Sequence, residues 1–189
     1  MQNKNKFARS KGDNLDTDAI IVAYGSNLSA SFPSEQMSAS QAFATVVKAL
    51  QGKGLLVTKI SRLWRSQAWP DASDPPYVNA VMVIGTDLQP VELMKSLHDI
   101  EREAGRVRDS QRYAPRVLDL DLIAYGRQIS DGTNGLILPH PRADERAFVM
   151  GPISEIMPQW QHPVLNETAE SIYKKSTIGI DAYPLEADA

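Results

Sequence analysis

The chain has 189 residues, of which 42% are hydrophobic and 23% are charged, and its formal net charge at pH 7 is -3. This length suits one domain with a sizeable core, and the negative charge argues against a protein that coats nucleic acid or anionic membrane. The absence of cysteine excludes disulfides, thiolate metal sites and a cysteine nucleophile. No apolar run reaches the roughly 18 residues that cross a bilayer.

The two ends of the chain are predicted to be tails around a single domain, residues 19–175. Residues 1–18 lack the apolar segment of a secretory signal, which favours a disordered N-terminal tail over a weaker organelle-targeting interpretation. Residues 176–189 are short and acidic and predict a peripheral C-terminal tail. We expect a cytoplasmic protein that acts as a monomer.

The first half of the domain predicts a strand, a helix and two further strands. Residues 19–25 form a short apolar, β-prone run that Gly25 ends. Ser38 and Gln41 have the spacing of a capping box, and the apolar residues that follow recur at helical intervals. Residues 55–67 and 77–86 are predicted to be strands, with a proline-rich loop between them.

The second half predicts a helix that starts at Pro90, a basic loop, and a strand over 116–126. Residues 136–152 are predicted to be a strand end followed by a loop. The resulting order, β-α-β-β-α-β, is typical of a ferredoxin-like α/β sandwich of the α+β class. In this fold the helices pack on one face of an antiparallel sheet.

Two aspartates interrupt the most hydrophobic strand, "RYAPRVLDLDLIAYG" at 112–126. Side chains at i and i+2 of a strand share a face, so Asp119 and Asp121 project together with their backbones about 7 Å apart. Two carboxylates this close repel each other unless a cation lies between them. Mg²⁺ is the natural candidate, because it takes carboxylate oxygens and keeps positions open for phosphates. The alternative is an edge strand with a solvated polar face.

Arginines cluster immediately before this strand. Five of them, with no lysine, fall within 15 residues: Arg102, Arg106, Arg108, Arg112 and Arg116. The guanidinium group matches phosphate oxygens with two parallel hydrogen bonds. A metal pair beside such a cluster suits transfer of a phosphate-bearing group, although a solvated charged loop remains the alternative. The chain has no P-loop and no dinucleotide-binding glycine motif.

Three further features have both a functional and a purely structural interpretation. Glu101 lies at the flank of a buried helical stripe and needs a partner, which is either a structural ion pair or a ligand. His140 lies between two prolines near Arg142 and Arg146, and is either a site residue or a surface histidine. Several aromatic residues at loop–strand junctions could fill the core or sandwich a flat heterocycle: Trp69, Tyr77, Tyr113 and Phe148.

The chain resembles the 6-hydroxymethyl-7,8-dihydropterin pyrophosphokinase family of folate biosynthesis. The resemblance covers about residues 19–160 and rests chiefly on "RYAPRVLDLDLIAYG". Supporting stretches occur in the family's order: "AYGSNL" at 23–28, "YVNAV" at 77–81, "IEREAGRVR" at 100–108 and "LPHPRADERAF" at 138–148. Tyr113 stands where a tryptophan is common, and Pro141 stands where some members have an aromatic residue.

The resemblance implies transfer of pyrophosphate from ATP, as co-substrate, to the hydroxymethyl group of the pterin, with release of AMP. It implies two Mg²⁺ ions bound by Asp119 and Asp121, with Arg106 and Arg116 stabilising the transferred phosphates. Further ATP contacts are implied for His98, Glu101, Arg108, Arg112, Tyr113, Leu122, His140 and Arg146. Pterin contacts are implied for Ser66, Tyr77, Asn79 and Phe148.

Two other classes of function compete with this interpretation. A nucleotidyltransferase that uses an Asp-x-Asp pair places a Gly-Ser turn shortly before the acids, but Gly25 and Ser26 lie far upstream. A non-catalytic ferredoxin-like module that binds RNA or a protein partner would need exposed aromatic residues on a basic sheet face. The chain is acidic overall and places its aromatic residues at strand ends, so pyrophosphokinase chemistry is favoured.

Overall fold

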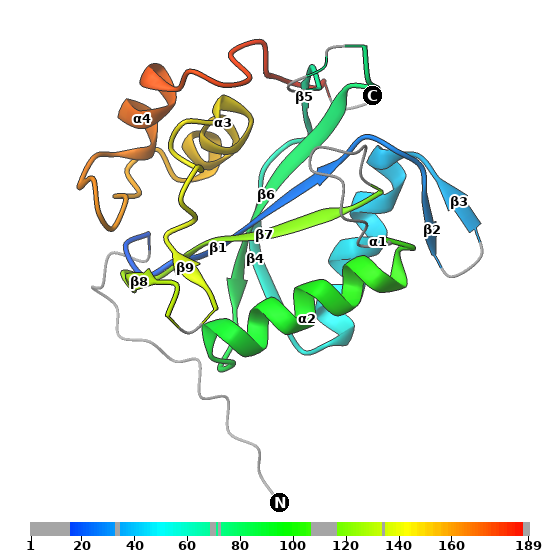
Figure 1. Cartoon of the computed structure of the whole chain (residues 1–189), viewed down its shortest axis with the longest axis horizontal. Coiled ribbons are helices and arrows are strands. Elements are labelled where there is room, and N and C mark those ends of the chain that lie inside the picture. Colours follow the sequence, from blue (N-terminus) through cyan, green and yellow to red (C-terminus); the bar gives the residue numbers. More distant parts are fainter. Residues whose placement is uncertain are drawn as a thin grey trace, which may run out of the picture.

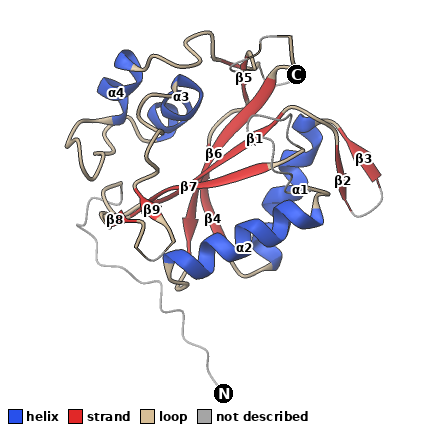
Figure 2. Cartoon of the chain, viewed as in Figure 1, coloured by secondary structure: helices blue, strands red, loops and turns tan. Residues whose placement is uncertain are grey.

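The computed structural model describes residues 16–32, 35–68, 71, 73–106, 117–133 and 135–186. Its main sheet has the order β10-β5-β6-β1-β7, with β4 also paired to β6, and all of these pairs are antiparallel (Figures 1 and 2). The strands are β1 (Ile20–Ser26), β4 (Leu56–Ile60), β5 (Trp64–Ser66), β6 (Tyr77–Gly85), β7 (Asp119–Tyr125) and β10 (Tyr183–Pro184). Two small ribbons pair β2 (Ala30–Phe32) with β3 (Glu35–Met37), and β8 (Ser130–Asp131) with β9 (Ile137–Leu138).

The helices of the described residues are α1 (Ala39–Gly52), α2 (Pro90–Glu103), α3 (Ala147–Ile156) and α4 (Ala169–Lys175). The predicted β-α-β-β-α-β core is confirmed. The predicted strand over 55–67 is two strands, because three residues separate Ile60 from Trp64 where only two separate their partners on β6. Ser61 bridges this irregularity, since its hydroxyl oxygen accepts a hydrogen bond from Val81 N at 2.9 Å.

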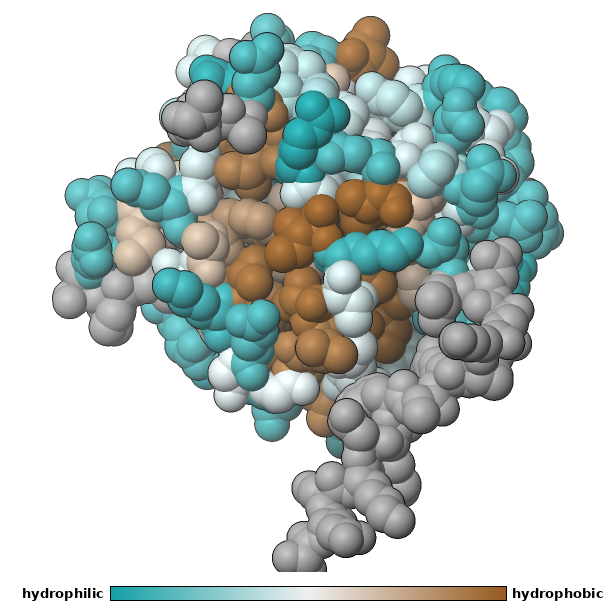
Figure 3. Space-filling view, turned by 180° about the vertical axis from the view of Figure 1, so that it is seen from behind, coloured by the Kyte–Doolittle hydropathy of each residue, from teal (hydrophilic) through white to brown (hydrophobic). Residues whose placement is uncertain are grey.

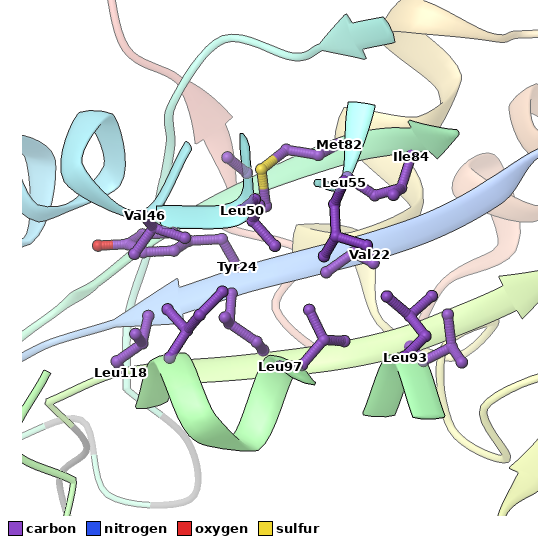
Figure 4. Packing of buried hydrophobic residues seen from close by; sticks show 14 of the residues in the cluster. Val22, Tyr24, Val46, Leu50, Leu55, Met82, Ile84, Leu93, Leu97 and Leu118 are labelled. Carbon is purple, nitrogen blue, oxygen red and sulfur yellow. The ribbon is translucent and has the colours of Figure 1, made fainter. Parts of the chain in front are cut away.

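Both predicted helices begin where their capping residues indicate. The Ser38 hydroxyl accepts a hydrogen bond from Gln41 N at 3.3 Å, and Ser38 N donates to Gln41 Oε1 at 3.0 Å. Pro90 occupies the first turn of α2, where its missing N–H costs no hydrogen bond. The apolar stripes of α1 and α2 pack on one face of the sheet, against residues such as Tyr24 and Leu118 (Figure 4).

The opposite face carries α3 and α4, so helices cover both faces of the sheet instead of one (Figure 1). Residues 147–152 were predicted to be a loop, which is wrong: they form the N-terminal part of α3. The helix contains Gly151 and Pro152, two residues that usually interrupt helices. Close packing explains the glycine, because a Cβ atom at position 151 would lie 2.6 Å from the Trp64 ring.

The segment after α4, predicted to be a peripheral tail, is described as far as residue 186 and packs on the fold. Ala147 N donates to Ile178 O at 2.8 Å, and Leu185 N donates to Leu63 O at 2.7 Å. Between these contacts, β10 extends the sheet beyond β5. The described part of this segment is therefore integral to the sheet edge. Residues 1–15 of the predicted N-terminal tail lie outside the described residues.

The far side of the molecule presents an apolar area across its middle (Figure 3). Within the described chain, β4 pairs with β6 and carries two exposed apolar side chains, Leu56 and Ile60. None of the described helices is long and apolar enough to span a membrane.

Candidate active site

A cavity of about 310 Å³ lies on the sheet face that α3 covers only in part. Its floor comes from β1, β5, β6 and β7, and its walls come from the loop before α3, the first turn of α3 and the C-terminal segment. The lining residues are Ala23, Tyr24, Gly25, Ser66, Gln67, Tyr77, Asn79, Asp119, Asp121, His140, Arg146, Phe148, Val149 and Ile178.

Asp119 and Asp121 both line this cavity, as the strand alternation predicts. They lie opposite two small residues of the neighbouring strand, since the register pairs Asp121 with Ala23 and Asp119 with Gly25. These small residues keep the floor low beside the carboxylates. The intervening Leu120 points to the opposite face, where it is fully buried.

A partly buried chain of ion pairs orients the first of the two aspartates. Arg106 Nη1 donates to Asp119 Oδ1 at 2.6 Å and also to Glu101 Oε1. Glu101 is only 2% exposed, and its Oε1 also accepts a hydrogen bond from Leu120 N at 2.8 Å. The carboxylate at the end of α2 thus binds both the arginine and the start of β7. This arrangement fixes a guanidinium group beside the aspartate pair.

A second cavity, of about 380 Å³, lies at the end of α2 and is lined by His98, Glu101, Arg102 and Arg106. Arg106 lines this cavity and bonds to Asp119, which lines the first one. The two cavities therefore meet at the Arg106–Asp119 ion pair. The predicted ATP-contacting pair, His98 and Glu101, lies in the second cavity.

His140 is held by backbone contacts at the wall of the first cavity. The backbone N–H of His140 donates to Ile123 O at 2.8 Å, and its ring atom Nδ1 accepts a hydrogen bond from Arg142 N at 3.3 Å. Burial lowers the pKa of His140 to about 4, and Arg146 adds to this shift, whereas Asp119 opposes it. The ring is therefore neutral near pH 7, and since Nδ1 accepts, Nε2 carries the proton.

Arg146 and Phe148 come from the start of α3. Arg146 is the N-cap residue, and its guanidinium carbon lies 5.7 Å from the centre of the Phe148 ring. This distance is within the range of a cation–π contact. The two side chains present a charge and a flat apolar surface to the same cavity.

The polar edge of the cavity comes from adjacent strands. Asn79 Nδ2 donates to Ser66 Oγ at 3.1 Å, and both residues are buried. A Cβ atom at position 25 would lie 3.8 Å from Asn79 Oδ1 and 4.0 Å from the Tyr77 ring. The hydrogen bond to Ser66 fixes the Asn79 amide, so its oxygen lies near the Tyr77 ring at the cavity floor.

The carboxylate pair fits a Mg²⁺ ion that takes some of its ligands from the protein and the others from a substrate. Among the described residues, no group of three or more His, Cys, Asp or Glu side chains forms a closed metal site. Mg²⁺ is usually held by one or two carboxylates together with substrate phosphates and water. Asp119 and Asp121 offer such a partial set of oxygen ligands.

Not every predicted site residue is brought to the cavities. The Leu122 side chain is 2% exposed and packs in the core with α1 and α2, so it reaches neither cavity. Four of the predicted residues lie outside the described residues: Arg108, Arg112, Tyr113 and Arg116.

Sequence reasoning gave no site role to six residues that line the first cavity: Ala23, Tyr24, Gly25, Gln67, Val149 and Ile178. The first three lie in the stretch 23–28 that supported the family resemblance. Val149 lies on the unpredicted helix α3, and Ile178 lies in the segment predicted to be a tail. Nothing in the local pattern around Ile178 distinguishes a cavity wall from a surface segment.

Comparison with known proteins shows one consistent similarity. Residues 21–158 match the family model described as 7,8-dihydro-6-hydroxymethylpterin-pyrophosphokinase. A 2-amino-4-hydroxy-6-hydroxymethyldihydropteridine pyrophosphokinase from Pseudomonas aeruginosa is 34% identical over 166 residues, which is 87% of this chain and 96% of that protein. A protein of the same name from Haemophilus influenzae is 38% identical over 135 residues, or 71% of this chain and 79% of the other.

Longer proteins are similar over part of their length. The Folic acid synthesis protein fol1 of Pneumocystis carinii is 33% identical over 171 residues. The match covers 90% of this chain but only 22% of that relative. Among solved structures, a wild-type Plasmodium falciparum HPPK-DHPS superimposes with a TM-score of 0.63 at 11% identity, over 89% of this chain and 48% of the other. At this identity the superposition supports the fold alone.

Proposed function

The chain belongs to the 7,8-dihydro-6-hydroxymethylpterin-pyrophosphokinase family, and we propose that it transfers pyrophosphate from ATP to 6-hydroxymethyl-7,8-dihydropterin, with release of AMP. The acceptor is the hydroxymethyl group of the pterin. This reaction is a step of folate biosynthesis. The names of the relatives that match most of their own length support the same activity.

One observation carries this assignment to residues: a single cavity contains two neighbouring carboxylates, a phenylalanine ring and a fixed asparagine amide. A pterin is flat and has hydrogen-bonding groups along its edge. We propose that it stacks between Phe148 and Tyr77, with Asn79 and Ser66 at its polar edge. Its hydroxymethyl group would then point toward Asp119 and Asp121.

The second cavity is the proposed site for part of ATP. His98, Glu101 and Arg106 line it, and Arg106 extends to Asp119 at the junction with the first cavity. The Arg106 guanidinium group would then lie beside the negatively charged pyrophosphoryl group as it passes from ATP to the pterin. Arg116 is proposed to share this role, and Arg108, Arg112, Tyr113, His140 and Arg146 to supply further ATP contacts.

The transfer requires little covalent chemistry from the protein. The pterin hydroxyl oxygen forms a bond to the β-phosphorus of ATP, and the bond from that phosphorus to the α–β bridging oxygen breaks. AMP leaves with this oxygen, and the hydroxyl proton passes to solvent. Arg106 stabilises the developing charge, and the neutral His140 can donate a hydrogen bond through Nε2. Holding the two substrates in line supplies much of the rate enhancement.

We propose two Mg²⁺ ions, held by Asp119 and Asp121 together with phosphate oxygens. When bound, they would neutralise phosphate charge and increase the acidity of the pterin hydroxyl. Glu101 would then support the site by accepting hydrogen bonds from Arg106 and from the β7 backbone.

We further propose that the protein works in the cytoplasm as a monomer, as the composition and the family of metabolic enzymes favour. Size-exclusion chromatography with light scattering should then give one species near the chain mass of 20.9 kDa. A species of twice that mass would contradict the monomer.

The reaction is tested by measuring nucleotide products from MgATP with and without 6-hydroxymethyl-7,8-dihydropterin. Pterin-dependent AMP that disappears on addition of EDTA is expected. ADP as the product would indicate an ordinary kinase, and no nucleotide product would contradict the assignment.

A further inference from the structure

We infer that residues 177–185, beyond the region matched by the family model, are a positioning element of the pterin pocket. This inference rests on the proposed function, because it assigns the cavity at α3 to the pterin. The segment lines the cavity through Ile178 and contacts two other parts of its lining. One is the start of α3 with Phe148, and the other is the end of β5 with Ser66.

The first contact is with the start of α3. Ile178 O accepts a hydrogen bond from Ala147 N at 2.8 Å, and Ile178 N donates to Glu145 O at 2.9 Å. These two bonds join the segment to the residues on either side of Arg146, in a parallel bridge. The segment therefore fixes the backbone from which Arg146 and Phe148 project.

Gly179 then sets the position of the Phe148 ring. Its φ is +66°, which favours glycine, and a Cβ atom there would lie 2.4 Å from Phe148 Cδ1 and 3.0 Å from Cε1. Real side chains do not approach this closely, so any other residue at 179 must displace the ring. The ring lies flush against this backbone only because the residue is glycine.

The second contact is with the end of β5. Asp181 Oδ2 accepts a hydrogen bond from Gln67 N at 2.6 Å, directly after Ser66. The chain then forms β10, which pairs Tyr183 with Arg65. A carboxylate acceptor makes the bond to the backbone stronger than a neutral one would. The segment thus contacts both the part of the pocket with the stacking ring, Phe148, and the part with the polar side chain, Ser66.

The test is calorimetric titration of the full chain with 6-hydroxymethylpterin, in the presence of a non-hydrolysable MgATP analogue. The variant Gly179→Ala should bind the pterin about three- to tenfold more weakly, because the stacking ring is displaced. Its affinity for the ATP analogue should fall by less, because His98, Glu101 and Arg106 line the other cavity. The separation of these two affinities distinguishes a positioning role from a general loss of structure.

Gly54→Ala is the matched control. Gly54 has a similar φ of +79°, but a Cβ atom there meets nothing within 4 Å. Both variants carry the same backbone strain, so both should lower the melting temperature slightly, but only Gly179→Ala should weaken pterin binding. Equal pterin affinity in the two variants would overturn the inference.

Asp181 gives an independent second test. Asp181→Ala removes the acceptor and should raise the KM for pterin with little change in kcat, whereas Asp181→Asn keeps an oxygen acceptor and should restore most of the affinity. If the wild type binds the pterin and neither Asp181→Ala nor Gly179→Ala weakens this binding, the positioning role is refuted but the proposed function is not. A wild-type chain that binds no pterin would instead refute the proposed function.

Discussion

The two faces of the central sheet use the same strands for different purposes. On one face, α1 and α2 cover the strands with a continuous apolar cluster that includes Leu118, Leu120 and Leu122. On the other face, α3 and α4 bury part of the sheet and leave a cavity over Asp119 and Asp121. Strand β7 carries Leu120, Leu122 and both aspartates, because its side chains alternate between the faces.

This difference shows how the fold provides a rigid site. A shift of β7 by one residue would exchange leucines and aspartates between the faces, so burial of the leucines fixes the register strongly. The aspartates inherit this fixed register without contributing to the core themselves. Changes on the open face should therefore reduce catalysis and spare stability, and changes on the closed face should do the reverse.

The largest effect on catalysis is expected from the aspartate pair. Asp121→Asn keeps the size of the side chain and removes its charge, and kcat should fall by about 10³-fold or more, because charge stabilisation in the transfer step is lost. The melting temperature should stay close to that of the wild type. Steady-state kinetics and thermal unfolding measure the two quantities.

Asp131→Asn, at the exposed ribbon β8, is the control and should retain full activity. Near-normal turnover by Asp121→Asn would contradict the role of the open face. A large loss of stability in this variant would contradict the separation of the two faces.

The largest effect on stability is expected from the neighbouring leucine. Leu120→Ala deletes a fully buried side chain and should cost about 2–5 kcal/mol of unfolding free energy. At urea concentrations below its unfolding transition, Leu120→Ala should still turn over substrate, because its site residues are unchanged. Leu56→Ala, at an exposed position of β4, should change stability by no more than about 0.5 kcal/mol. Urea unfolding compares them, and equal losses would show that the closed face is not the main source of stability.

An intermediate effect is expected from the carboxylate that joins the two faces. Glu101→Gln keeps an oxygen acceptor for Leu120 N but removes the negative charge that holds Arg106. Loss of such a supporting partner should reduce kcat roughly 10- to 100-fold. The control is Glu103→Gln on the same helix, where the glutamate is exposed and pairs with Lys53 at 2.9 Å. If both variants lose activity equally, Glu101 has no special role.

The smallest effect concerns pH. Burial lowers the pKa of His140 to about 4, from 6.5 in the unfolded chain. Between these values the unfolded state binds more protons, so the unfolding free energy falls as the pH drops below 6.5. Lowering the pH from 7.5 to 5.5 should remove about 1 kcal/mol through this group.

Urea unfolding at several pH values measures this dependence, and His140→Gln isolates it. Burial also lowers the pKa of His162, which contributes with the same sign in both proteins. The variant should therefore lose stability less steeply than the wild type below pH 6.5. Identical pH profiles would show that His140 is not held neutral by the fold.

The core of the fold was accessible from sequence because its signals are local. The capping box at Ser38, Pro90 at the start of α2 and the alternation of β7 each act within a few residues, and the structure confirms them. Helix α3 was missed because Gly151 and Pro152 weaken its local signal, while its packing on the sheet stabilises it.

The candidate site divides in the same way. The shared face of Asp119 and Asp121 follows from strand geometry, and the need of Glu101 for a partner follows from its place on the helix. The roles of Ile178 and Gly179 depend on contacts with α3 that lie about 30 residues away in the chain. No local pattern encodes such contacts, so they became visible only in the folded structure.

The most direct test of the central proposal, pyrophosphate transfer on the open sheet face, is ³¹P NMR of the products formed from MgATP and 6-hydroxymethyl-7,8-dihydropterin. We predict signals of AMP and of a pterin diphosphate in equal amounts from the wild type, and neither product from Asp121→Asn. ADP together with a pterin monophosphate, or the same diphosphate from Asp121→Asn at an unchanged rate, would contradict the proposal.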